Sequence, residues 1–140
     1  MAADRAGEAS EPWWIIGSAA VALHGAPVIN VRDVDLMMGQ NDARRFLASV
    51  GVAPEPASDH PRFRSMVLGI WGEPPLPVEV FGDFSLATSN GWRPVRLHSR
   101  EPVTVGGRSV FVPSAGELEA LLLSFGRAKD LERARLLRRG

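Results

Sequence analysis

The sequence predicts a single domain of the α+β class. Its 140 residues suit one ordinary domain, and its 45% hydrophobic content is enough to build a core. Segments typical of strands and of helices follow one another in mixed order, and no internal repeat is present. Residues 1–11 are polar and are expected to form a flexible tail, so the domain is expected to span residues 12–140.

The N-terminal part of this domain predicts two strands, each followed by a helix. The apolar run 13–16 is typical of a buried strand, and the alanine-rich segment 18–23 favours a helix that ends in a Gly-Ala-Pro turn. Residues 28–38 are expected to form a second strand that is bent in its middle. Asn41 is expected to cap a helix over residues 42–50, whose apolar side chains share one face.

The C-terminal part predicts more strands and a helical end. A proline-rich loop is expected over residues 51–61. Strands are expected over 62–70, 77–81 and 92–97, and a hairpin over 102–112. Helices are expected over 114–125 and 129–139. The hairpin is indicated by Gly106-Gly107 between two β-branched runs. The spacing of Ser114 and Glu117 is that of a capping box, and Gly126 separates the two helices.

Composition excludes several classes of protein. The 16 basic and 16 acidic residues cancel, so affinity from blanket neutralisation of phosphates is not expected. No cysteine is present, which excludes disulfides, thiolate nucleophiles and cysteine-ligated zinc. The nearly apolar run 13–23 is shorter than the roughly 20 residues of a membrane span, and the polar start is unlike a secretory signal. We therefore expect a cytoplasmic protein without membrane contact. Lys129 is the only lysine.

Three acidic residues form the sharpest motif. Asp33 and Asp35 stand two residues apart on an expected strand, so their side chains should project from the same face. Two such carboxylates repel each other unless a cation lies between them, and their hard oxygen ligands suit magnesium or manganese. Two solvated acids on an edge strand are the alternative. Glu79, flanked by apolar residues in a second expected strand, would complete a three-carboxylate site of the type that supports phosphoryl or nucleotidyl transfer.

A Gly-Ser pair precedes these acids in the chain. Gly17 and Ser18 stand at the expected turn between the first strand and the first helix. Glycine allows a phosphate to approach the backbone, and free N–H groups at a helix start favour an anion. A simple turn with a helix cap is the alternative.

In this order, the motifs resemble the nucleotidyltransferase superfamily that includes DNA polymerase β, in its small bacterial branch. The matching residues are Ile16-Gly17-Ser18, Asp33-Val34-Asp35-Leu36 and Val78-Glu79-Val80. Residues 126–131 also resemble the Arg-x-Lys-Asp block of the branch that holds the type IV toxin–antitoxin transferases. The resemblance spans residues 13–133.

The resemblance implies a mixed sheet with helices packed on one face and a C-terminal helical segment. It implies a nucleoside triphosphate as substrate and Mg²⁺ or Mn²⁺ as cofactor. The residues it implies as catalytic are Asp33, Asp35, Glu79, Lys129 and Asp130, those that bind the nucleotide are Gly17, Ser18, Arg127 and Lys129, and the metal ligands are Asp33, Asp35 and Glu79. Glu79 would also help to deprotonate the attacking hydroxyl, and Asp130 would orient Lys129.

The expected activity is Mg²⁺-dependent transfer of a nucleoside monophosphate from the triphosphate to a hydroxyl. Protein, tRNA and small molecules are open as acceptors, and a toxin–antitoxin partner is open as well. Relatives commonly carry Arg and Thr where Ile29 and Val31 stand, so a non-catalytic nucleotide sensor or partner-binding protein of the same fold is the alternative. A sugar-nucleotide glycosyltransferase is a third reading of the paired aspartates. Arginines of the last helix, Arg133, Arg135, Arg138 and Arg139, would guide an RNA or acidic partner, or form a solvated face.

Overall fold

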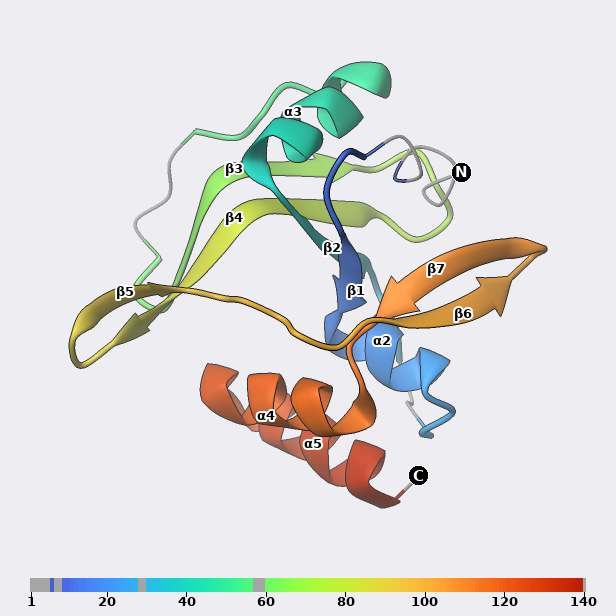
Figure 1. Cartoon of the computed structure of the whole chain (residues 1–140), viewed down its shortest axis with the longest axis vertical. Coiled ribbons are helices and arrows are strands. Elements are labelled where there is room, and N and C mark those ends of the chain that lie inside the picture. The colour runs from blue at the N-terminus through green and yellow to red at the C-terminus, as the bar shows by residue number, and fades with distance from the viewer. Residues whose placement is uncertain (1–5, 7–8, 28–29, 57–59, 140) are drawn as a thin grey trace.

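The computed structural model describes residue 6 and residues 9–27, 30–56 and 60–139. Its main feature is a mixed sheet in which β2 (Val34–Met38) and β4 (Val78–Thr88) run parallel side by side (Figure 1). The strand order is β1-β2-β4-β3, with β1 (Trp14–Ile16) and β3 (Phe63–Trp71) antiparallel to their neighbours. The α+β class with a mixed sheet is therefore confirmed.

Two hairpins extend from this framework on opposite sides (Figure 1). The end of β4 pairs with β5 (Gly91–Pro94), and β6 (Glu101–Val105) pairs with β7 (Arg108–Val112) as a separate ribbon. At the tip of this ribbon Gly106 and Gly107 have φ angles of 57° and 78°. Two positive φ angles in succession define the turn that glycine pairs favour, so the hairpin predicted over 102–112 is confirmed.

Helix α3 (Gln40–Ser49) covers one face of the sheet. It packs so closely that a β-carbon added to Gly69 would lie 2.6 Å from Leu47 Cδ1, and one added to Gly82 would lie 2.8 Å from Ala43 Cβ. Side chains alternate along a strand, so Gly82 and Val80 face α3 while Glu79 and Phe81 point to the opposite side. That opposite side of β4 remains available for a functional site.

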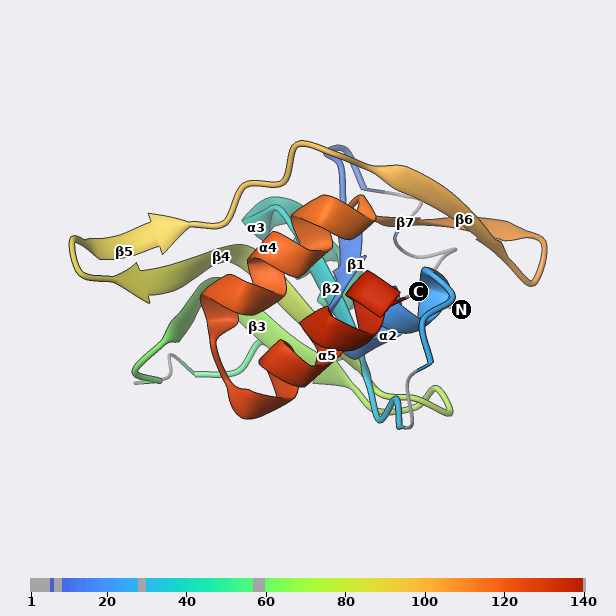
Figure 2. The ribbon, with the colours of Figure 1, turned by 90° about the horizontal axis from the view of Figure 1, so that it is seen from below.

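The other helices gather away from α3 (Figures 1 and 2). Helix α2 (Gly17–Leu23) contacts both α4 (Ala115–Phe125) and α5 (Ala128–Arg139), and α4 packs along α5. These helices and the sheet share a buried core, whose fully buried members include Val21, Leu36, Leu47, Val78, Val80, Val112, Leu118 and Leu122. In the part of the chain that the structure describes, no helix is long and apolar enough to cross a membrane.

The predicted caps have different outcomes. Ser114 caps α4 as predicted, since its side chain accepts a hydrogen bond of 3.2 Å from the Glu117 N–H, and Gly126 ends α4 with a φ of 73°. The prediction for α3 is wrong: its N-cap residue is Gly39, and Asn41 lies inside the helix. Asp83 of β4 supplies the missing acceptor, receiving hydrogen bonds of 3.2 Å from Gln40 N and 2.9 Å from Gln40 Nε2.

Several boundaries also differ from the predicted ones. Of the strand expected over 28–38, residues 28–29 lie outside the described residues, residues 30–33 are not strand, and β2 begins at Val34. Strand β4 is longer than predicted because its far half is extended by pairing with both β3 and β5. Conversely β5 ends at Pro94, earlier than predicted.

The segment predicted as a flexible tail is anchored at its end. The buried carboxylate of Asp42 accepts hydrogen bonds from the backbone N–H of Ser10 at 3.0 Å and of Glu11 at 2.9 Å. It also accepts one from the Ser10 hydroxyl at 3.1 Å. These bonds attach residues 10 and 11 to α3, so the boundary at residue 12 is wrong for them; residues 1–5 and 7–8 lie outside the described residues.

Candidate metal and nucleotide site

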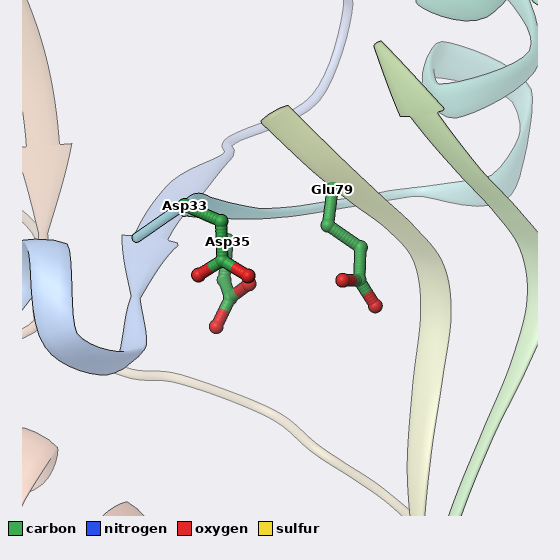
Figure 3. A group of neighbouring side chains, drawn as sticks. All are labelled: Asp33, Asp35 and Glu79. Carbon is green, nitrogen blue, oxygen red and sulfur yellow. The ribbon is translucent and has the colours of Figure 1, made fainter. Parts of the chain in front are cut away.

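Three carboxylates meet on the side of the sheet opposite α3. Asp35 and Glu79 are direct register partners in the parallel pair of β2 and β4, and Asp33 lies in the segment that enters β2. Figure 3 shows all three side chains projecting to the same side. One carboxylate oxygen from each residue lies within 4.8 Å of those of the other two. The structure therefore brings together the three residues that the sequence predicted as metal ligands.

The electrostatics of this cluster favour a bound cation. Burial, the Asp33 charge and the Glu79 charge together raise the pKa of Asp35 from 3.8 to about 7. Burial and the Asp33 charge also raise the pKa of Glu79, against the lowering effect of Lys129 and Arg127. Half-buried carboxylates that repel one another are the donor set that a hard divalent ion binds and stabilises. Asp33, Asp35 and Glu79 thus fit Mg²⁺ or Mn²⁺.

Gly17 is required by this cluster in a way that the sequence did not reveal. Its φ is 68°, and a β-carbon added to it would lie 2.6 Å from Asp35 Oδ2. Both the backbone conformation and the missing side chain therefore make room for the Asp35 carboxylate. Ser18, which follows, is 4% exposed and lines the pocket in front of the carboxylates.

That pocket has a volume of about 540 Å³ and is lined by both acidic and basic side chains. The acidic residues are Asp33, Asp35 and Glu79. The basic residues are Arg32, which directly precedes Asp33, Arg127, which directly precedes α5, and Lys129 and Arg133 of α5. A cavity lined by both kinds of charge can hold a metal ion and a polyanion next to each other.

Asp130 has a different partner from the one predicted. It is 1% exposed, and its carboxylate accepts hydrogen bonds from Arg127 Nε at 2.6 Å and Arg127 Nη2 at 3.0 Å. The guanidinium also lies over the Phe63 ring, with 4.9 Å from Cζ to the ring centroid. Asp130 therefore fixes Arg127 in the pocket wall, whereas the sequence predicted that it orients Lys129.

Lys129 and Arg133 remain available to a ligand. Among the described residues neither forms an ion pair or a side-chain hydrogen bond, and both line the pocket. Other arginines of α5 are engaged elsewhere: Arg135 pairs with Glu132, and Arg138 pairs with Glu119 at 2.8 Å. The arginines of this helix, for which an RNA-guiding face and a solvated face were both open, are thus partly neutralised, and the Arg139 side chain lies outside the described residues.

Comparison with a solved structure identifies the fold. TM1012, a candidate nucleotidyltransferase from Thermotoga maritima, matches with a TM-score of 0.77 at 26% sequence identity, covering 99% of this chain and 86% of that chain. This chain has the nucleotidyltransferase fold. Sequence comparison alone adds no relative, because no family model and no curated protein matches it.

More distant structures share the nucleotidyltransferase fold. The antibiotic-resistance factor ANT(2″)-Ia matches with a TM-score of 0.63 at 16% identity, covering 97% of this chain and 78% of that chain. The lincosamide antibiotic adenylyltransferase LnuA matches with a TM-score of 0.54 at 16% identity, covering 91% of this chain and 85% of that chain. These two structures share the fold with this chain, and neither is described as part of a toxin–antitoxin system.

The nucleotidyltransferase-fold pocket also contains residues that the sequence prediction missed. Aromatic side chains form a wall of the pocket, and they come from β3, β4 and α4: Phe63, Phe81, Phe84 and Phe125. Phe81 could have been found, since it stands two residues after Glu79 and strand alternation places both on one face. The others reach the pocket only through the pairing of β3 with β4 and the packing of α4, which no local pattern reveals.

Proposed function

We propose that this chain is a divalent-metal-dependent nucleotidyltransferase that moves a nucleoside monophosphate from its triphosphate to a hydroxyl. One observation carries the proposal: the three convergent carboxylates of Asp33, Asp35 and Glu79 line a single pocket together with the cations Lys129 and Arg133. The fold of the structural neighbours supports the same enzyme class.

The residues divide the chemistry between them. Asp33, Asp35 and Glu79 would hold Mg²⁺ or Mn²⁺, which when bound supplies positive charge to the phosphate oxygens. The hydroxyl oxygen of the acceptor forms a bond to the α-phosphorus, and the bond from that phosphorus to the β-phosphate bridging oxygen breaks. Its electron pair leaves with pyrophosphate, whose charge Lys129 and Arg133 are placed to offset. Glu79 is also placed to accept the proton of the hydroxyl, because its carboxylate lines the pocket beside Asp33 and Asp35.

The predicted residues that do not touch the metal have supporting roles in this proposal. Ser18 and the backbone after Gly17 would contact the phosphates, since Ser18 lines the pocket beside Asp35. Arg127, held by Asp130 and stacked on Phe63, presents a fixed positive charge to the same pocket. A fixed cation stabilises developing charge without having to reorganise during the reaction.

The structural neighbours favour a small molecule among the three acceptor classes. ANT(2″)-Ia has been crystallised with adenylyl-2″-tobramycin, and LnuA is an antibiotic adenylyltransferase solved with lincomycin bound. Small-molecule hydroxyls are therefore acceptors for two proteins that share this fold. Protein and tRNA acceptors, a toxin–antitoxin partner and a cytoplasmic location stay predictions from the sequence.

Transfer can be tested with each α-³²P-labelled nucleoside triphosphate, Mg²⁺ and a cell extract, with pyrophosphate release measured alongside. The wild-type chain should label an acceptor and release pyrophosphate, while Asp33→Asn and Asp35→Asn should both abolish the label. Full activity in both variants would exclude the proposed metal site.

A nucleotide sensor with the same fold is the second candidate. It is favoured by the half-buried, apolar Val31, which stands shortly before the carboxylates where relatives commonly have a polar residue. Calorimetry with Mg²⁺ and a triphosphate separates the two functions, because a sensor binds the nucleotide without releasing pyrophosphate. If the triphosphate does not bind at all, both functions are excluded and a role in binding a partner protein remains.

A further inference from the structure

A second cavity, with a volume of about 830 Å³, opens beside the metal and nucleotide pocket. The two cavities share one wall, formed by Glu79 together with His60, Phe63, Phe81 and Phe84. Beyond that wall the second cavity extends over β3 towards Trp92 of β5. A group bound there would therefore meet the nucleotide pocket at Glu79, the proposed acceptor of the hydroxyl proton.

The lining of this second cavity is predominantly apolar. Leu68, Met66 and Trp92 belong to it, and the latter two are unusually exposed for their type, at 59% and 39%. Pro56 and Pro61 add further apolar surface. Exposed apolar side chains gathered in a cavity next to a catalytic site are typical of a surface that binds an apolar part of a ligand.

The charges in this cavity disfavour a phosphorylated ligand. Among the described residues of the lining, Glu55 and Glu79 contribute two carboxylates, while Arg64 is the one arginine or lysine. Its guanidinium already lies over the Trp92 ring, with 4.9 Å from Cζ to the ring centroid. An RNA end needs several cations for its phosphates, and the described arginines and lysine that line the nucleotide pocket are Arg32, Arg127, Lys129 and Arg133, against Arg64 alone in the second cavity.

We infer that the second cavity binds the acceptor, and that the acceptor is an uncharged or cationic small molecule with an apolar ring and a hydroxyl. The inference rests on the proposed function, which supplies the reaction. The apolar ring lies against Met66, Leu68 and Trp92, and the hydroxyl reaches Glu79 at the shared wall. A phosphorylated small molecule and an RNA 3′ end are excluded as acceptors by the same charges.

The test uses a variant inside the cavity and a control outside it. Met66→Gln places an amide in the cavity at nearly unchanged side-chain length. Leu123→Gln is the control, since Leu123 of α4 is also an exposed apolar residue, at 45%, and lines neither cavity. Trp92→Ala provides a second position in the cavity.

The probes are cyclohexylmethanol and 4-methylbenzyl alcohol for the inferred class, and glycerol 3-phosphate and an RNA hexamer with a free 3′-hydroxyl for the excluded classes. Each is titrated into ¹³C-methyl-methionine-labelled protein that is saturated with Mg²⁺ and an ATP analogue with an α–β methylene bridge. The Met66 methyl resonance, assigned by its loss in Met66→Gln, reports on occupancy, and the Trp92 indole N–H provides a second resonance that remains in that variant.

The ring alcohols should shift both resonances in the wild-type protein. Their affinity should fall about tenfold in Met66→Gln and Trp92→Ala and remain unchanged in Leu123→Gln. Binding of the phosphorylated probes in this cavity, or no shift with the ring alcohols, would overturn the inference. Calorimetry of the Mg²⁺–nucleotide complex is the separate measurement for the proposed function: retained nucleotide binding with no ring-alcohol binding refutes the acceptor class alone.

Discussion

At the scale of single residues, Asp35 lowers the stability of the metal-free fold because its carboxylate is placed for metal binding. Its pKa is raised to about 7 because it is buried beside Asp33 and Glu79. A carboxyl whose pKa is higher in the folded state than in the unfolded state stabilises the fold most when protonated, at low pH. That stability is lost as the pH rises through about 7. The metal-free protein should therefore be less stable at about pH 8 than at about pH 5 through this group.

Asp35→Asn should raise the stability of the metal-free protein by roughly 2 to 4 kcal/mol at about pH 8, and by much less at about pH 5. The reason is that the amide removes the charge that burial and two neighbouring carboxylates disfavour. Urea denaturation in EDTA at the two pH values measures the difference. An equal gain at both pH values would show that charge is not the cause.

Gly17 is the second residue whose effect is local. Gly17→Ala places a methyl group 2.6 Å from Asp35 Oδ2, so the carboxylate has to move and Mg²⁺ affinity should fall at least about tenfold. Calorimetric titration with Mg²⁺ measures this loss. Gly25→Ala is the matched control, because Gly25 also has a positive φ, 84°, but its added β-carbon would meet nothing within 4 Å. Both variants should lose about 1 kcal/mol from backbone strain, and only the first should lose metal affinity.

At the scale of secondary-structure elements, the sequence was informative wherever the pattern was local. The Gly106-Gly107 hairpin and the Ser114 cap were correct because each depends on residues adjacent in the chain. The cap of α3 was wrong because its acceptor, Asp83, is more than forty residues away and arrives only through β4. Strand β4 was underestimated for the same reason, since its second half is extended by partners rather than by its own pattern.

The cap from Asp83 is testable by comparison with the residue that the sequence had favoured. Asp83→Ala should destabilise the protein by about 1 to 2 kcal/mol, because α3 loses an acceptor at its start and alanine tolerates the Asp83 φ of 49° poorly. Asn41→Ala should change the stability by less than about 0.5 kcal/mol, since Asn41 is exposed and makes no capping bond.

Thermal or urea unfolding measures both variants. Asp83→Gly separates the two causes, because glycine relieves the backbone strain but supplies no acceptor. If Asp83→Gly matches the wild-type stability, strain rather than capping is the whole effect of Asp83→Ala.

At the scale of the whole molecule, the net charge of zero conceals a separation of charge. Acids gather at the beginnings of β2 and β4, bases gather around the start of α5, and both sets line one pocket. Motif order predicted the three carboxylates because strand alternation and parallel pairing are general rules. The space that Gly17 leaves for Asp35 and the aromatic wall were not predictable, since each depends on three-dimensional packing. The pair of Arg127 and Asp130 was missed although it is local, because residues three apart at a helix start are neighbours.

This separation of charge makes the stability of the molecule depend on metal and pH together. Millimolar Mg²⁺ should raise the melting temperature, because an ion bound to Asp33, Asp35 and Glu79 relieves the repulsion among them. If the concentration is about ten times Kd, the stabilisation is about 1.4 kcal/mol, or a rise of roughly 4 to 6 °C. The rise should be smaller at about pH 6 than at about pH 8, since protons compete for Asp35 below a pKa of about 7.

Scanning calorimetry with Mg²⁺ and then with excess EDTA measures this coupling. EDTA should return the melting temperature to its metal-free value, and Asp35→Asn should show almost no response to Mg²⁺ at either pH. Glu11→Gln is the control for a distant acid, because Glu11 lies beside Gly39 and α3 on the opposite side of the sheet. If Glu11→Gln weakens the Mg²⁺ response as much as Asp35→Asn, the ion binds diffusely to the surface instead of to the three carboxylates.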